Sequence, residues 1–173
     1  MRKCVFFDRD GIVNRSPGKG YVERWSDFVL EPEFVEVLKR IRSLGYEGVV
    51  ITNQSGVARG VMSEDAVRDI HARLQEELTK EHGAPLLDIL YCPHSDGQCD
   101  CRKPQPGMLL RAASKHSIDL EQSWMIGDQE RDIEAGRRAG CRTILVDDSA
   151  RVTRADFRVG NLAGLKSFIA EVL

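Results

Sequence analysis

The chain has 173 residues, of which 30% are charged and 42% hydrophobic, and its formal net charge at pH 7 is −2. This length predicts one domain over residues 1–173 with a sizeable core. The charge argues against general nucleic-acid binding, and no apolar run approaches the roughly 20 residues of a membrane span. The first strand begins within a few residues and no signal-peptide pattern precedes it, so we expect a cytoplasmic protein. We also expect a monomer with no membrane or nucleic-acid partner.

Strand and helix patterns alternate along the chain. Buried strands are predicted over residues 4–7, 48–52, 86–91, 123–126 and 143–146. Amphipathic helices are predicted over residues 33–44, 63–82, 107–116, 130–139 and from 161 onward. The pattern is typical of an α/β fold with a doubly wound parallel sheet. The irregular stretch 12–30 is long for a connection, and such loops are commonly functional.

Two carboxylates follow the first strand directly. Asp8 and Asp10 are two residues apart, so at strand spacing both side chains would point the same way, and Gly11 follows them. The carboxyl ends of parallel strands are where such sheets place their chemistry. A cation between the two acids, or a proton on one of them, would relieve their repulsion. They could bind Mg²⁺, or act as nucleophile and proton donor, while an ordinary Asp-Gly turn is the alternative.

Further polar residues follow the second and fourth strands. Thr52 ends the second strand, and the next backbone N–H groups could cradle an anion, although Thr is also an ordinary strand residue. Asp128 follows the fourth strand and could complete a magnesium site with Asp8 and Asp10. Asp132, one turn into the next helix, could be a ligand or a support.

Three thiols and an imidazole lie within the loop 92–101, at Cys92, His94, Cys99 and Cys101. This is a complete ligand set for a closed, structural zinc site, and unrelated thiols or a disulfide are the alternatives. Arg102 and Lys103 follow at once, in a segment that two prolines stiffen. We expect these cations to bind a phosphate, with a solvated basic pair as the alternative.

Several of these motifs together resemble a known family. Asp8-x-Asp10, Thr52, Lys103 and Gly127-Asp128-x-x-x-Asp132, in this order, resemble the four motifs of the haloacid dehalogenase (HAD) superfamily of phosphatases over nearly the whole chain. Cys-x-His and Cys-x-Cys before Arg-Lys-Pro resemble its branch of heptose bisphosphate phosphatases and histidinol-phosphatases. Segments 7–11, 52–60 and 102–108 are nearer to the heptose enzymes.

The resemblance implies a Rossmann-like HAD fold with a minimal cap, in which the loop 14–30 and the zinc loop are the lids. It implies that Asp8 is the nucleophile and a magnesium ligand, that Asp10 is the general acid/base and offers its backbone carbonyl, and that Asp128 is the third ligand. Thr52 and Lys103 would hold the phosphoryl oxygens, with Asp132 in support, and the cysteine and histidine set would hold Zn²⁺. The expected substrate-binding residues are Ser16, Lys19, Asn53, Gln54, Ser55, Arg59, Arg102 and Gln129.

The resemblance further implies a Mg²⁺-dependent phosphomonoesterase that acts on a small phosphosugar. The reaction would remove the C7 phosphate of D-glycero-D-manno-heptose 1,7-bisphosphate through an aspartyl-phosphate, in the nucleotide-heptose synthesis that serves lipopolysaccharide. Gln129 stands where the heptose enzymes are expected to carry lysine, and the spacing from His94 to Cys99 is nearer to histidinol-phosphatases. Histidinol phosphate is therefore the alternative substrate. A catalytically silent phosphosugar-binding domain and a small zinc-ribbon module are the alternatives outside enzymes, and the intact set of acids argues against both.

Overall fold

A six-stranded parallel sheet forms the centre of the protein in a computed structural model that describes residues 1–173. Its strands lie in the order β3-β2-β1-β4-β5-β6, and every neighbouring pair is parallel. They span β1 Lys3–Phe7, β2 Tyr46–Asn53, β3 Asp88–Cys92, β4 Trp124–Gly127, β5 Arg142–Val146 and β6 Phe157–Val159. The predicted fold class is confirmed.

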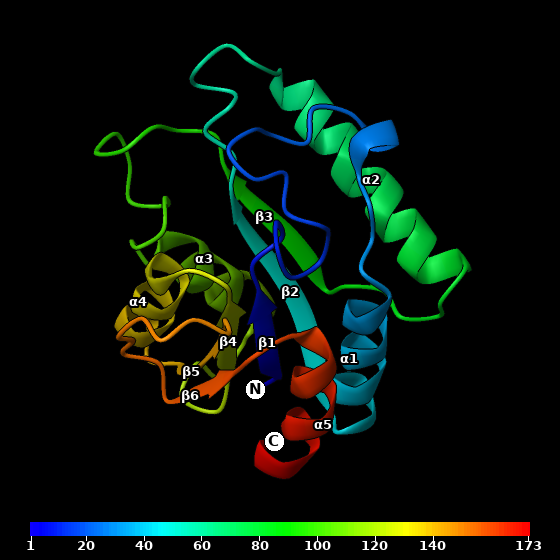
Figure 1. The fold of residues 1–173 in the computed structure, drawn as a ribbon, viewed down its shortest axis with the longest axis vertical. Coiled ribbons are helices and arrows are strands. Elements are labelled where there is room, and N and C mark those ends of the chain that lie inside the picture. The colour runs from blue at the N-terminus through cyan, green and yellow to red at the C-terminus, as the bar shows by residue number, and fades with distance from the viewer.

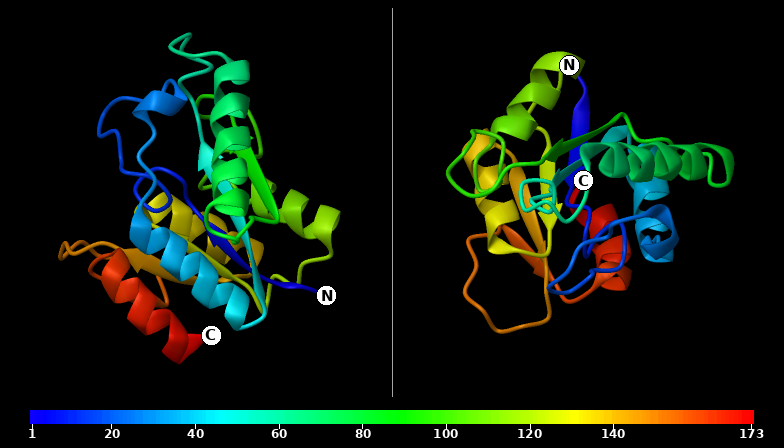
Figure 2. Two further views of the ribbon diagram at one scale, coloured as in Figure 1. Left: turned by 90° about the vertical axis from the view of Figure 1, so that its right-hand side faces the viewer. Right: turned by 90° about the horizontal axis from the view of Figure 1, so that it is seen from above.

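Helices cover both faces of the sheet (Figures 1 and 2). One face packs against α1 Pro32–Ser43, α2 Glu64–Lys80 and α5 Leu162–Val172, and the other against α3 Gly107–His116 and α4 Glu130–Ala139. Along β1, Val5 and Phe7 belong to the hydrophobic core on the side of α1, α2 and α5, and Cys4 and Phe6 belong to the core on the side of α3 and α4. Because both faces are covered, this strand is apolar throughout instead of alternating.

Local sequence signals set several element boundaries. Ser63 accepts a hydrogen bond from the backbone N–H of Ala66 at 3.1 Å, which caps α2 as a serine at that position should. Gly45 follows α1 with a φ of +82°, a conformation that glycine adopts without strain. The sequence patterns missed β6 and a short 3-10 helix at Trp25–Asp27, because each has only three residues. None of the helices is both long and apolar enough to cross a membrane.

The strand order reverses between β1 and β4, and such a switch point is where open α/β sheets bind ligands. Asp8 follows β1, and Asp128 follows β4. The loops after β1, β2 and β3 all rise at the carboxyl end of the sheet, and both chain termini lie at the opposite end (Figure 1). The topology therefore collects the motif residues at one edge.

Candidate active site

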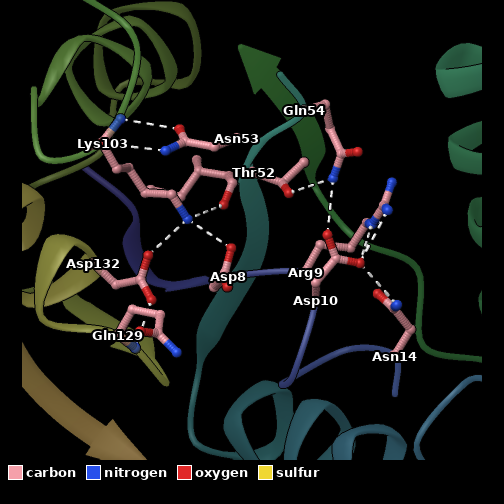
Figure 3. A network of polar contacts seen from close by, with 11 residues as sticks. Asp8, Arg9, Asp10, Asn14, Thr52, Asn53, Gln54, Lys103, Gln129 and Asp132 are labelled. Carbon is pink, nitrogen blue, oxygen red and sulfur yellow. Dashed lines mark hydrogen bonds and ion pairs between the residues drawn. The ribbon is translucent and has the colours of Figure 1, made fainter. Parts of the chain in front are cut away.

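A buried ion pair lies at the centre of this edge (Figure 3). The ammonium Nζ of Lys103 lies 2.6 Å from Asp8 Oδ1 and 2.8 Å from Asp132 Oδ1, and it donates to the backbone carbonyl of Ile51 at 3.0 Å. Burial lowers the pKa of a lysine, but the charges of Asp132 and Asp8 outweigh it and raise the pKa of Lys103. Lys103 therefore keeps its positive charge, and three oxygens contact its ammonium group.

Asn53 fixes the backbone of Lys103. Its side-chain Nδ2 donates to the Lys103 carbonyl at 3.0 Å, and its Oδ1 accepts from the Lys103 N–H at 3.0 Å. This double hydrogen bond ties the end of β2 to the segment after the cysteine loop. Asn53, expected to bind substrate, therefore also positions the lysine.

Three carboxylates surround one lysine. Single oxygens of Asp8, Asp128 and Asp132 lie within 4.8 Å of one another, which leaves excess negative charge. Burial, and then the charge of Asp132, raise the pKa of Asp8, although Lys103 opposes this. The same two causes raise the pKa of Asp128 to about 6. Asp128 Oδ1 is buried without a hydrogen-bond partner. Hard oxygen donors with uncompensated charge fit a Mg²⁺ ion.

Asp10 belongs to a different set of contacts. Strand β1 ends at Phe7, and Asp10 lies in the turn that follows, so the strand-spacing argument does not extend to it. Its Oδ1 accepts from Asn14 Nδ2 at 2.9 Å and from Arg9 Nη2 at 3.0 Å, and its Oδ2 accepts from Gln54 Nε2 at 3.0 Å. Burial would raise the pKa of Asp10, but Arg9 and these hydrogen bonds outweigh it and lower the pKa. The structure holds Asp10 as a carboxylate.

Arg9 is a fully buried residue that the sequence patterns did not single out. Besides Asp10, its guanidinium Nη1 lies 3.1 Å from Nε2 of His71 on α2. Arginine can only donate, so Nε2 accepts and the imidazole is neutral. Burial, and then the charge of Arg9, lower the pKa of His71 to about 3. His71 is buried and orients the arginine that holds Asp10.

Thr52 and Gln54 link these two parts of the site. Gln54 Nε2 donates to Thr52 Oγ1 at 2.9 Å as well as to Asp10 (Figure 3). Both side chains are buried and lie behind the wall of the cavity above the site. The structure therefore places Gln54, expected to contact substrate, where it positions Asp10.

A cavity of about 280 Å³ lies above Asp8, Asp10 and Asp128. Of the expected substrate-binding residues, the cavity is lined by Ser16, Lys19, Asn53, Ser55, Arg59, Arg102 and Gln129. Arg131, at the start of α4, also lines it and was not predicted, although a cation beside Asp128 is a readable signal. Tyr21 and Ser55 join the two flanking loops through a 3.3 Å contact between Tyr21 Oη and Ser55 Oγ. Polar and basic side chains thus line the cavity, which suits the binding of an anion.

The four expected zinc ligands lie together. The Sγ atom of Cys101 is 2.9 Å from that of Cys92, 3.3 Å from that of Cys99 and 3.4 Å from His94 Nδ1. All five cysteines of the chain are free thiols, so the disulfide alternative is not the arrangement found. Three sulfurs and an imidazole nitrogen around one point fit a closed zinc site. The other two cysteines, Cys4 and Cys141, are buried in the core away from this loop.

Comparison with known proteins agrees with this geometry. A HAD-hydrolase-like family model matches residues 100–157. The chain is 45% identical over 145 residues to a D-glycero-β-D-manno-heptose-1,7-bisphosphate 7-phosphatase of Helicobacter pylori, covering 83% of each protein. It is 43% identical over 146 residues to the corresponding α-heptose phosphatase of Photorhabdus laumondii, covering 80% of this chain and 78% of that protein.

A solved structure is similar over nearly the full length. The D,D-heptose 1,7-bisphosphate phosphatase of B. bronchiseptica, complexed with magnesium and phosphate, superposes with a TM-score of 0.86 at 28% identity, covering 99% of each chain. The relatives are named for heptose bisphosphates, so histidinol-phosphatase is not the favoured alternative. The chain is a phosphoric monoester hydrolase, and it belongs to the D-glycero-D-manno-heptose-1,7-bisphosphate 7-phosphatase family of HAD-like hydrolases.

Proposed function

We propose that this protein removes the 7-phosphate from D-glycero-D-manno-heptose 1,7-bisphosphate, with Mg²⁺ as the catalytic metal. The observation that carries the proposal is the carboxylate of Asp8, which lies at the floor of an anion-binding cavity and is paired with Lys103. A nucleophile in that position meets a phosphate that enters the cavity, and phosphoryl transfer depends mainly on such positioning and charge neutralisation. The names of the relatives support the choice of substrate.

The reaction proceeds in two steps. A carboxylate oxygen of Asp8 attacks phosphorus, the bond between phosphorus and the sugar oxygen breaks with its electron pair on that oxygen, and Asp10 supplies the proton. Water then attacks the aspartyl-phosphate, Asp10 takes the proton of the water, and the acyl-phosphate P–O bond breaks to regenerate Asp8. Lys103, paired with Asp8, neutralises charge beside the reacting phosphorus. Thr52 lies behind the cavity wall, where it accepts a hydrogen bond from Gln54 and so helps to position Asp10.

The contacts of Asp10 suit both of its tasks. In the free protein Arg9, Asn14 and Gln54 hold it as a carboxylate, which is the form that accepts a proton from water. The first step needs a protonated Asp10. A phosphate dianion bound beside it favours that form, because a nearby like charge raises the pKa of a carboxyl group.

Mg²⁺ would be held by Asp8 and Asp128 and by the backbone carbonyl of Asp10, and Asp132 would support Lys103 instead of binding the metal. When bound, the ion neutralises charge on the transferring phosphoryl group. Zn²⁺ would be held by Cys92, His94, Cys99 and Cys101, and it would stiffen the loop that carries Arg102 and Lys103.

The basic side chains around the cavity support a substrate with two phosphates. Lys19, Arg59, Arg102 and Arg131 all line it, more positive charge than a single phosphate at Asp8 requires. A second phosphate on the leaving sugar would be bound by these residues. We infer that the enzyme acts as a cytoplasmic monomer in the nucleotide-heptose synthesis for lipopolysaccharide.

The test is phosphate release from heptose 1,7-bisphosphate and from histidinol phosphate, with added Mg²⁺. Asp8→Asn is the inactive variant. Asp148→Asn is the matched control, because Asp148 also follows a strand at this edge but does not line the cavity. We expect strong preference for the heptose, full loss in the Asp8 variant and little change in the control. Preference for histidinol phosphate would overturn the substrate, and turnover by Asp8→Asn would overturn the mechanism.

A further inference from the structure

Asp96 lies at the tip of the cysteine loop and contacts a residue of the cavity. Its Oδ1 accepts a hydrogen bond from Arg102 Nε in a close ion pair. The Asp96 side chain is 92% exposed, whereas that of Arg102 is 14% exposed. The acid therefore reaches in from solvent and pairs with a guanidinium that a substrate would also contact.

Two more arginines, Arg59 and Arg131, line the same cavity as Arg102. These three arginines come from three different loops or helix ends, and all line the cavity. The side chains of Arg59 and Arg131 have no hydrogen-bond or ion-pair partner in the structure, whereas Arg102 is paired with Asp96.

We propose that Asp96 competes with the second phosphate of the substrate for this arginine cluster, Arg59, Arg102 and Arg131, and so limits how tightly the product is held. The inference rests on the proposed function, since the product keeps the phosphate that was not hydrolysed. That phosphate would remain on the arginine cluster after the reaction. A carboxylate tethered beside the cluster has a high effective concentration, so it re-forms its pair and assists release.

The strength of the Asp96 contact suits such a competitor. An ion pair with one exposed partner is weak, so a phosphate, which arginine can bind through two hydrogen bonds, can displace it. A substrate without a second anion leaves the pair intact. Asp96 thus affects the binding of sugars that carry a second phosphate and has little effect on simple monoesters.

The test uses Asp96→Asn, which keeps the shape of the side chain and removes the charge. p-Nitrophenyl phosphate, which lacks a second anion, is the reporter substrate, and heptose 1-phosphate is the inhibitor. We expect the inhibition constant of heptose 1-phosphate, and the KM of the bisphosphate, to fall about three- to fivefold. The KM of p-nitrophenyl phosphate should not change.

Asp100→Asn is the matched control. Asp100 is an exposed acid of the same loop, and its partner is Arg111 on α3, 3.7 Å away and outside the cavity lining. This variant should change neither constant. In an Arg131→Gln background the effect of Asp96→Asn should shrink, because the two residues act on one anion position.

An unchanged or raised inhibition constant in Asp96→Asn, with zinc content and melting temperature as in the wild type, would overturn the proposal. A raised constant would mean that Asp96 positions Arg102 for the substrate. If heptose 1,7-bisphosphate is not hydrolysed at all, the proposed function fails separately. Inhibition by fructose 1,6-bisphosphate compared with fructose 6-phosphate then still reports whether Asp96 opposes a second phosphate.

Discussion

Lys103 Nζ lies 2.6 Å from Asp8 Oδ1, and the two side chains are only 1% and 8% exposed. They are 95 residues apart in the sequence. Removal of either partner would leave the other as an unpaired buried charge, which is strongly destabilising. The pair places a cation directly beside the proposed nucleophile.

Lys103→Met should lower kcat by about 100-fold or more, because a preorganised cation that meets developing charge is worth this much or more in other enzymes. The measurement is steady-state phosphate release at saturating substrate, with circular dichroism to confirm the fold. Lys115→Met, which removes a lysine paired with Asp88 away from the cavity, is the control and should keep full activity. A kcat for Lys103→Met within threefold of the wild type would contradict the assigned role.

Gly11→Ala should weaken Mg²⁺ binding. A Cβ at Gly11 would come within 2.2 Å of Asp128 Oδ2, and the φ of +93° at this residue is strained for any other amino acid. The carboxylate of Asp128 would have to move away from the proposed metal position. The measurement is the Mg²⁺ concentration that gives half-maximal activity, together with the rise in melting temperature on adding Mg²⁺.

For this variant the control is Gly18→Ala. Gly18 also has a positive φ, +68°, but an added Cβ there meets nothing within 4 Å. The control should therefore show the backbone strain without the loss of metal affinity. Equal Mg²⁺ responses in the two variants would show that Gly11 matters only for its backbone conformation.

Cys99→Ser should remove bound zinc and raise the KM of the bisphosphate more than it lowers kcat. The thiolate is one of four ligands, and the backbone N–H of Arg102 also donates to Cys99 Sγ at 3.4 Å. Loss of the metal would free the segment that carries Arg102, whereas Lys103 is also held by Asp8, Asp132 and Asn53, so kcat should change less. Metal content and both kinetic constants are measured, with Cys141→Ala, a buried thiol outside the loop, as the comparison. A Cys99→Ser protein that retains its zinc would contradict the ligand assignment.

The sequence predicted the parts of the site that depend on strand ends. Asp8 and Asp128 could be placed together because each follows a buried strand, and the carboxyl ends of parallel strands share one edge. The zinc ligands of the cysteine loop could be predicted because they lie close together in the sequence. Asp10 lines the same cavity as Asp8, but β1 ends before it, so strand spacing could not predict the contacts of its carboxylate.

The buried partners of Asp10 could not be predicted in this way. Arg9 and His71 are 62 residues apart, and nothing in the local pattern around His71 distinguishes a histidine that accepts from a buried arginine from one that only packs. Arg131 and Asp96 were missed because exposed charges on helices and loops are common. Their role can be inferred only from their positions at the cavity, and the cavity forms only when the chain folds.

The neutral state of His71 predicts how stability changes with pH. Its pKa is about 3 in the folded protein, whereas an unfolded chain has the ordinary value near 6.5. Below pH 6.5 His71 therefore binds a proton in the unfolded chain but not in the folded protein. The stabilisation from His71 is complete above this pH and is lost as the pH falls toward 3, by about 1.4 kcal/mol for each pH unit.

His71→Gln should remove this dependence, because glutamine does not titrate and its carbonyl can still accept from Arg9. The measurement is urea unfolding at pH 7.5 and pH 5.0. The fall in the free energy of unfolding between these two values should be smaller in the variant by about 2 kcal/mol, from 1.5 pH units below the ordinary pKa. Other groups, including Asp8 and Asp128, titrate in both proteins, so the difference isolates His71. His82→Gln, which changes a histidine that makes no contact with Arg9, should keep the pH dependence of the wild type. If His71→Gln and the wild type lost the same stability, the imidazole would be protonated in the fold and could not accept from Arg9.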